Sequence, residues 1–185
     1  MLHSEPLKKQ IGTFKGLTFR YLTSADAKEY QAIRLQALQK YPERYYRDLA
    51  EEENRSLNIV AKMLEDRNKV GNFILGAFAH NKLYAIIGFH QYEPVHINHK
   101  AYLYGCYIND TVHNEEAVYR LFIQCILDEA ALVSNLTQIE VTATLSYEKS
   151  ILEEYGFEQY GYSVDAIQVV DKFYDEIFYK KILKF

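Results

Sequence analysis

The fold is decided by residues 100–143, which read KAYLYGCYINDTVHNEEAVYRLFIQCILDEAALVSNLTQIEVTA. The flanking segments 100–109 and 138–143 are short and rich in apolar residues, which favours strands. Two strands joined through one helix in the same sheet run parallel, so this stretch predicts one parallel pair. Residues 114–133 predict that helix, because apolar side chains recur there at intervals of three and four: Val118, Leu121, Phe122, Cys125, Ile126, Leu132 and Val133.

The residues before this stretch predict antiparallel strands. Segments 72–79 and 83–92 are apolar runs rich in Phe, Ile and Tyr. Residues 80–82 separate them, which indicates a hairpin. A second turn at 94–98 leads into the strand at 100–109. Three strands joined by short turns are typical of an antiparallel meander.

Further elements are predicted on both sides of these strands. Residues 17–22 alternate apolar and polar side chains as a strand does. Two helices follow, of which the first begins at Ser24 and is ended by Pro42. Downstream, Gly156 is placed to end a short helix as a C-cap glycine. The last two strands are predicted at 157–162 and 173–182.

The element order is therefore β-α-α-β-β-β-α-β-α-β-β. It predicts an α+β fold whose central sheet is mixed, mostly antiparallel and flanked by helices. We expect residues 1–16, which are mostly polar, to form a loose N-terminal extension. We expect residues 17–185 to form a single domain, a length that can bury a sizeable core.

The composition argues against several kinds of partner. A net charge of −4 supplies no overall basic field, which argues against nucleic acid. No apolar run approaches the length of a membrane span, and the N-terminal residues do not resemble a signal peptide, so we expect a cytoplasmic protein with no membrane partner. Cys106 and Cys125 have neither disulfide nor zinc-site spacing, and His96 and His99 lie in a short turn, so no metal site is predicted.

Several stretches, in matching order, resemble the GNAT N-acetyltransferase superfamily: FILGAF at 73–78, IGF at 87–89, HKAYLYGCYI at 99–108, ILEEYGFE at 151–158 and DKFYDE at 171–176. The resemblance runs from about residue 17 to residue 183 and implies the GNAT fold. It also implies acetyl-CoA or CoA as the cofactor and transfer of an acyl group to an amine. It places the pantetheine arm against the strand at 99–108, where the backbone of Cys106, Tyr107 and Ile108 would hold the cofactor.

The loop that holds the cofactor pyrophosphate departs from the family pattern. In GNAT enzymes the helix after this strand begins with Arg/Gln-x-x-Gly-x-Gly/Ala, whose glycines let backbone N–H groups approach the phosphates. An ungapped alignment places Glu116 and Val118 at the glycine positions, so Glu115 and Glu116 bring negative charge to the anion site and predict weak binding. Alternatively, both glutamates only complement the helix dipole. The expected cofactor loop is His113-Asn114-Glu115-Glu116-Ala117-Val118.

The position of the general acid also departs from the family. Many GNAT enzymes use a tyrosine in the last helix to protonate the leaving thiolate, and Leu152 occupies that position here. Leucine cannot donate a proton, so no residue is assigned as catalytic. At about 100° per residue, Tyr155 lies about 60° from Leu152 around a helix and Tyr147 about 140°. Tyr155 is therefore the better substitute, although its ring can equally serve packing.

The family places the acceptor beside the first helix and the loop that follows it. Arg34, Tyr45 and Tyr46 lie in these segments and are expected on the substrate side, because an arginine beside aromatic rings can bind by charge pairing and stacking. The acceptor would be a small-molecule amine, a protein N-terminus or a lysine. Two functions remain: an acetyl-CoA-dependent N-acetyltransferase whose activity is weak or lost, and a catalytically inactive GNAT-fold binding or regulatory protein. A homodimer is left open.

Overall fold

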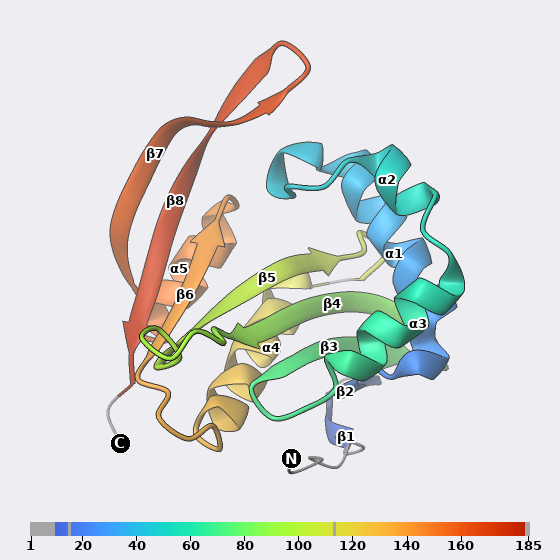
Figure 1. Cartoon of the computed structure of the whole chain (residues 1–185), viewed down its shortest axis with the longest axis horizontal. Coiled ribbons are helices and arrows are strands. Elements are labelled where there is room, and N and C mark those ends of the chain that lie inside the picture. Colours follow the sequence, from blue (N-terminus) through green and yellow to red (C-terminus); the bar gives the residue numbers. More distant parts are fainter. Residues whose placement is uncertain (1–9, 15, 113, 184–185) are drawn as a thin grey trace.

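The computed structural model describes residues 10–14, 16–112 and 114–183, and within these ranges the strands form one eight-stranded sheet (Figure 1). Among these strands only β5 and β6 run parallel, and the order is β1-β2-β3-β4-β5-β6-β8-β7. The prediction of an α+β fold with a mixed, mostly antiparallel sheet is confirmed. The strands are β1 (Gln10–Phe14), β2 (Leu17–Tyr21), β3 (Asn72–Ala79), β4 (Lys82–Gln91), β5 (Lys100–Ile108), β6 (Gln138–Ala143), β7 (Glu158–Val169) and β8 (Lys172–Ile182).

Helices cover both faces of the sheet (Figure 1). Helices α1 and α3 pack on one face, and α4 and α5 pack on the other. Among the described residues, no helix has the length and apolar character needed to cross a membrane. The helices are α1 (Ala27–Lys40), α2 (Leu49–Glu53), α3 (Leu57–Asp66), α4 (Glu115–Ala130) and α5 (Ser146–Glu154), with the 3-10 turns η1 (Ser24–Asp26) and η2 (Pro42–Arg44).

Each face of the sheet has its own hydrophobic core. On one face, Ile33, Ala37 and Leu38 of α1 are all buried against β3 and β4. On the other face, Phe122 and Ile126 of α4 are buried as the sequence predicts. Burying a side chain of this size contributes about 1.5–3 kcal/mol, so these two helices fix the sheet between them.

The structure differs from the sequence-based expectation at several elements, and β7 runs to Val169 instead of ending at residue 162. Residues Gln10–Phe14 pair with β2 as an edge strand, because backbone hydrogen bonding orders a polar segment that has no apolar pattern. The short helix α2 is not predicted, and it begins where the Asp48 side chain accepts hydrogen bonds from two backbone N–H groups. Helix α4 ends at Ala130, and Leu132 is 70% exposed instead of joining the apolar stripe.

Strands β5 and β6 separate after a short parallel ladder (Figure 1). They pair only over Lys100–Tyr102 and Gln138–Glu140. Residues 103–108 of β5 therefore have no partner strand on the side that faces β6. A bulge bends β5 at this point, since Ile86 of β4 pairs with Tyr107 while Gly88 pairs with Tyr104. The unpaired edge of β5 positions the candidate site.

Candidate active site

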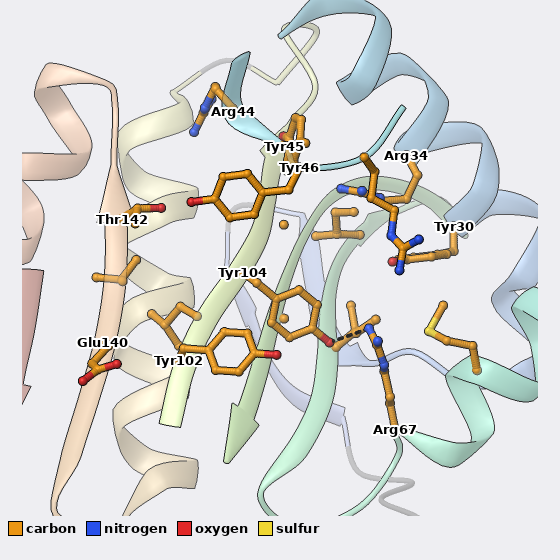
Figure 2. Close-up of a pocket in the computed structure, with 18 of the residues that line it drawn as sticks. Tyr30, Arg34, Arg44, Tyr45, Tyr46, Arg67, Tyr102, Tyr104, Glu140 and Thr142 are labelled. Atoms are coloured by element: carbon orange, nitrogen blue, oxygen red, sulfur yellow. Dashed lines mark hydrogen bonds between the residues drawn. The ribbon is translucent and has the colours of Figure 1, made fainter. Parts of the chain in front are cut away.

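A cavity of about 700 Å³ lies beside the point where β5 and β6 separate (Figure 2). Side chains from α1, α2 and α3 form one wall, and residues of β6, β7 and β8 form the opposite wall. Tyr102 and Tyr104 of β5 lie between the two walls in Figure 2. A cavity of this size can hold a small-molecule ligand.

A second cavity, of about 50 Å³, adjoins the first and reaches the other face of the sheet. Arg44, Tyr45 and Thr142 line both cavities. Tyr119 of α4 and Glu148 of α5 line the smaller one from the opposite face. We call the two cavities together the passage, because they lead from one face of the sheet to the other between β5 and β6.

Three successive residues, the last of η2 and the two that follow it, bridge the passage. Arg44 forms an ion pair with Glu148, and only 11% and 4% of these two side chains is exposed. Tyr45 donates a hydrogen bond of 2.8 Å from its hydroxyl to the carbonyl oxygen of Cys106, and Tyr46 donates one to the carboxylate of Glu176. This segment therefore contacts α5, β5 and β8 at once.

Glu148 also fixes the start of α5. Its Oε2 accepts hydrogen bonds from the backbone N–H groups of Thr144 and Leu145, at 3.2 and 3.1 Å. A carboxylate in the first turn caps the helix and complements its dipole. The Arg44–Glu148 pair therefore couples the loop after α1 to the first turn of α5.

Arginines and tyrosines dominate the α1 side of the larger cavity (Figure 2). Arg34 is only 8% exposed, and its guanidinium lies 4.9 Å from the centre of the Tyr45 ring. Arg67 donates a hydrogen bond of 3.0 Å to the Tyr104 hydroxyl. Burial raises the pKa of Tyr104 to about 12, so this phenol stays protonated at neutral pH.

The predicted substrate-side residues all line this larger cavity. Arg34 comes from the buried face of α1, and Tyr45 and Tyr46 come from the loop after η2. Figure 2 shows the Tyr46 hydroxyl pointing across the cavity towards Thr142 of β6. Since both tyrosine hydroxyls already donate hydrogen bonds within the protein, the groups that face the space between the two walls are the rings and the Arg34 guanidinium.

The start of α4 offers few free donors to an anion. Asn114 has a left-handed backbone (φ 80°), and its side chain accepts a hydrogen bond of 3.1 Å from the N–H of Ala117. Glu115 is half-buried, Glu116 is exposed, and Val118 is only 2% exposed and belongs to the core. His113, the first residue of the predicted cofactor loop, lies outside the described residues.

The predicted strand residues lie at the edge of the passage. Cys106 is partly buried, and desolvation together with the nearby Glu148 raises the pKa of its thiol, so it remains a neutral thiol. Tyr107 packs in the core on the α1 side and Ile108 in the core on the α4 side. What these residues offer a ligand is their backbone.

Leu152 is fully buried in the core, and the two tyrosines that flank it lie in different places. Tyr155 ends α5, is half-buried and lines neither cavity. Tyr147 packs edge-on against Tyr119, with ring centres 5.9 Å apart, and Tyr119 lines the smaller cavity. Burial and the nearby Cys106 and Glu148 raise the pKa of Tyr147. Tyr147 does not line either cavity itself, but its contact with Tyr119 links it to the passage, whereas the helical angle favours Tyr155.

Several site residues are not predicted from the sequence. Arg44 and Glu148 are 104 positions apart, and no local pattern joins them. Tyr30 and Arg67 line the larger cavity, but each reads as an ordinary helix or loop residue. A weak signal exists for Arg44 alone, since it directly precedes Tyr45 and Tyr46 in the predicted acceptor loop.

The family model of the GNAT acetyltransferase domain matches residues 19–178. The chain belongs to the GNAT acetyltransferase family. The resemblance inferred from the sequence is therefore confirmed. No curated protein matches this chain.

Solved GNAT structures share the fold at low sequence identity. A GNAT-family acetyltransferase from Streptococcus pneumoniae is 17% identical over 91% of this chain and 99% of its own, with a TM-score of 0.76. A putative acetyltransferase, yncA, from Salmonella typhimurium, solved with its cofactor acetyl-CoA, is 13% identical over 92% and 95%, with a TM-score of 0.77. A probable acetyltransferase from Staphylococcus epidermidis is 22% identical over 91% and 99%, with a TM-score of 0.71.

Proposed function

We propose that the protein transfers an acyl group from an acyl-CoA, such as acetyl-CoA, to a small-molecule amine in the larger cavity. The observation that carries this proposal is the passage itself. An unpaired strand edge at residues 103–108 meets a cavity large enough for an acceptor, in a chain of the GNAT family. Both partners of an acyl transfer can therefore meet at the edge of β5.

The edge of β5 fits the arm of an acyl-CoA. Unpaired backbone N–H and C=O groups of a strand edge bind extended chains that carry amides, and a pantetheine arm carries two amides. Cys106, Tyr107 and Ile108 lie on the part of β5 that has no partner strand on the β6 side, although the Cys106 carbonyl oxygen already accepts a hydrogen bond from the Tyr45 hydroxyl. Their backbone groups would hold the arm and polarise the acyl carbonyl.

The start of α4 fits the pyrophosphate poorly. The Asn114 side chain already accepts a hydrogen bond from the N–H of Ala117, and Glu115 and Glu116 bring negative charge. Two unit charges about 4 Å apart repel by about 4 kcal/mol at an effective dielectric of about 20. Glu116 is exposed to solvent, so salt and water reduce this repulsion. We therefore expect weak binding of CoA rather than none.

An acyl-CoA would supply the activated acyl group, and the residues of this chain would position the amine and supply a proton. Arg34 and Tyr45 form one wall of the acceptor cavity, next to the bulge of β5. The Tyr147 hydroxyl would donate a proton to the leaving thiolate, and because burial raises its pKa it is a weak acid whose contribution to the rate should be small for a general acid. Tyr147 would thus take the place that Leu152 leaves empty.

A specific observation favours a second function. The Arg44–Glu148 ion pair crosses the passage, and the start of α4 lacks the glycines of the family. Under this alternative, the chain is a catalytically inactive GNAT-fold protein that binds a ligand in the larger cavity. Entry of an acyl-CoA would then require Arg44 and the residues that follow it to move.

The test is single-turnover release of free CoA thiol from acetyl-CoA at millimolar concentration, with a panel of small amines and a peptide with a free N-terminus. The proposed function predicts thiol release that depends on the amine, together with acetylated amine detected by mass spectrometry. Binding of acetyl-CoA without release, for every amine in the panel, would support the inactive alternative instead.

A further inference from the structure

The larger cavity is positively charged in a protein whose net charge is −4. Each glutamate that lines it has a cation nearby: Glu52 lies 3.6 Å from Arg55, although its Oε1 has no hydrogen-bond partner, and Glu140 lies 3.2 Å from Lys100. The arginines outnumber these glutamates. The arginines that line the cavity are Arg34, Arg44, Arg47, Arg55 and Arg67.

Some of these arginines have no carboxylate partner. Within the ranges that the structure describes, Arg34, Arg47 and Arg67 form no ion pair. Arg34 is the informative case, because it is 8% exposed and its nearest aromatic contact is the ring of Tyr45. A buried charge without a counter-charge destabilises a fold, so such a group points to a ligand that brings the counter-charge.

Arg34 lies directly over the bulge of β5. A Cβ atom on Gly105 would lie 3.5 Å from Arg34 Nη1, and Gly105 has a left-handed backbone (φ 62°) that disfavours a side chain. The next residue is Cys106, at the edge of the passage. An anion bound to Arg34 would therefore hold the rest of a small ligand beside the unpaired edge.

Arg67 lies on the same wall as Arg34 (Figure 2). It is held by its hydrogen bond to Tyr104, whose ring lies so close to Gly88 that a Cβ there would be 2.2 Å from the ring. Burial raises the pKa of Tyr30, the charges of Arg34, Arg67 and Arg55 lower it, and that of Glu52 raises it, so three arginines and one carboxylate lie near this phenol. Tyr30, Arg34 and Arg67 thus converge on one part of the cavity.

We propose that the acceptor is a small amine that also carries an oxyanion group, such as a carboxylate, and that Arg34 and Arg67 bind that group. This inference rests on the proposed acyl transfer, which supplies the amine. The planar fork of arginine matches the two oxygens of a carboxylate or phosphate. With the oxyanion at Arg34, the amine of a compact ligand would lie close to the unpaired edge of β5.

The first test measures binding without an acyl-CoA. Calorimetry compares a panel of L-amino acids with their carboxamides, and phosphoethanolamine with ethanolamine, at low salt. We expect at least one oxyanion compound to bind at least tenfold more tightly than its neutral partner, and the responding pair distinguishes carboxylate from phosphate. Arg34→Met and Arg67→Met should each weaken that binding by about ten- to hundredfold, with Arg34→Lys in between.

The matched control is Arg120→Met, which removes an arginine on α4 that is 41% exposed and paired with Glu154 outside the cavity. Its ligand binding should equal that of the wild type. Because Arg34 has no counter-charge, Arg34→Met should melt at the same temperature as the wild type or higher, which separates a binding role from a structural one.

The second test measures transfer to the same pairs. The carboxamide has the larger fraction of unprotonated amine, so intrinsic reactivity favours it, and faster acetylation of the acid would show recognition of the oxyanion. Acetylation of the neutral partners as fast as the acids, with no oxyanion binding by calorimetry, would overturn the inference and leave the acyltransferase intact. Oxyanion binding that depends on Arg34, without transfer to any amine, would instead contradict the proposed function.

Discussion

On the α1 side, the passage between β5 and β6 opens into a cavity lined by arginines and tyrosines, whereas the start of α4 presents Glu115 and Glu116. The first region keeps Arg34 largely buried, with no ion-pair partner among the described residues, which suits a ligand that brings the counter-charge. The second region needs no bound anion, because the Asn114 side chain caps the helix and the glutamates complement its dipole. Under the proposed function, the α1 side therefore suits an acceptor better than the start of α4 suits an acyl-CoA.

The largest effect is expected at Arg44, which bridges the passage through its ion pair with Glu148. Arg44→Met would leave the Glu148 carboxylate buried without its partner, so the free energy of unfolding should fall by about 3–5 kcal/mol. Arg47→Met, three residues on, removes an exposed arginine with no ion pair among the described residues and should change it by less than about 0.5 kcal/mol. Chemical denaturation measures both. Equal stability of the two variants would contradict the bridge.

A smaller effect is expected at the proton donor. Tyr147→Phe should slow single-turnover release of CoA thiol by about a hundredfold, the lower bound for general acid catalysis, because a thiolate leaves readily unaided. Tyr155→Phe should change the rate by less than about twofold, since Tyr155, unlike Tyr147, has no ring contact with Tyr119 of the smaller cavity. The opposite pattern would indicate that Tyr155, and not Tyr147, donates the proton, as the angle around the helix suggests.

The glutamates at the start of α4 should have a moderate effect. Replacing Glu115 and Glu116 together by Gln should tighten CoA binding by about three- to thirtyfold at low salt, since each charge at a helix start is worth about 0.3–1 kcal/mol. The gain should shrink at high salt. Glu65→Gln, on the exposed surface of α3, serves as the control. If calorimetry shows no gain, charge at this helix is not the obstacle.

The smallest effect is expected at the cysteines. Burial raises the pKa of Cys125 to about 11 and that of Cys106 further, so neither forms much thiolate at pH 8. Iodoacetamide should leave both unmodified in the native protein while it labels free glutathione, and should label both after unfolding. Rapid native labelling of Cys106, seen by mass spectrometry, would show that the passage is open to a thiol reagent.

Most of the fold can be predicted from the sequence, because its main elements carry their own patterns. The apolar stripe of α4 and the runs of β3 and β4 each indicate an element, and the parallel pair follows from the helix between β5 and β6. The N-terminal strand β1 cannot be predicted this way, because its order comes from pairing with β2 and not from apolar side chains.

The site is predicted only in part. Arg34 and Tyr45 follow from the resemblance, and both line the larger cavity. The Arg44–Glu148 pair joins residues 104 positions apart, and the bulge at Gly105 depends on how β5 pairs with β4. Such contacts arise from the tertiary arrangement, so one sequence gives no pattern for them. The preference for Tyr155 over Tyr147 used the helical angle alone, without the position of α5 relative to the passage.

The affinity for acetyl-CoA tests the difference between the two regions most directly. Isothermal titration calorimetry of the purified protein with acetyl-CoA, and in parallel with CoA, measures this affinity at physiological salt. The poor fit at the start of α4 predicts a dissociation constant above about 100 μM, which corresponds to roughly −5.5 kcal/mol. A low-micromolar constant would contradict the account, because it would show that the α4 end holds the pyrophosphate despite Glu115, Glu116 and the capping Asn114.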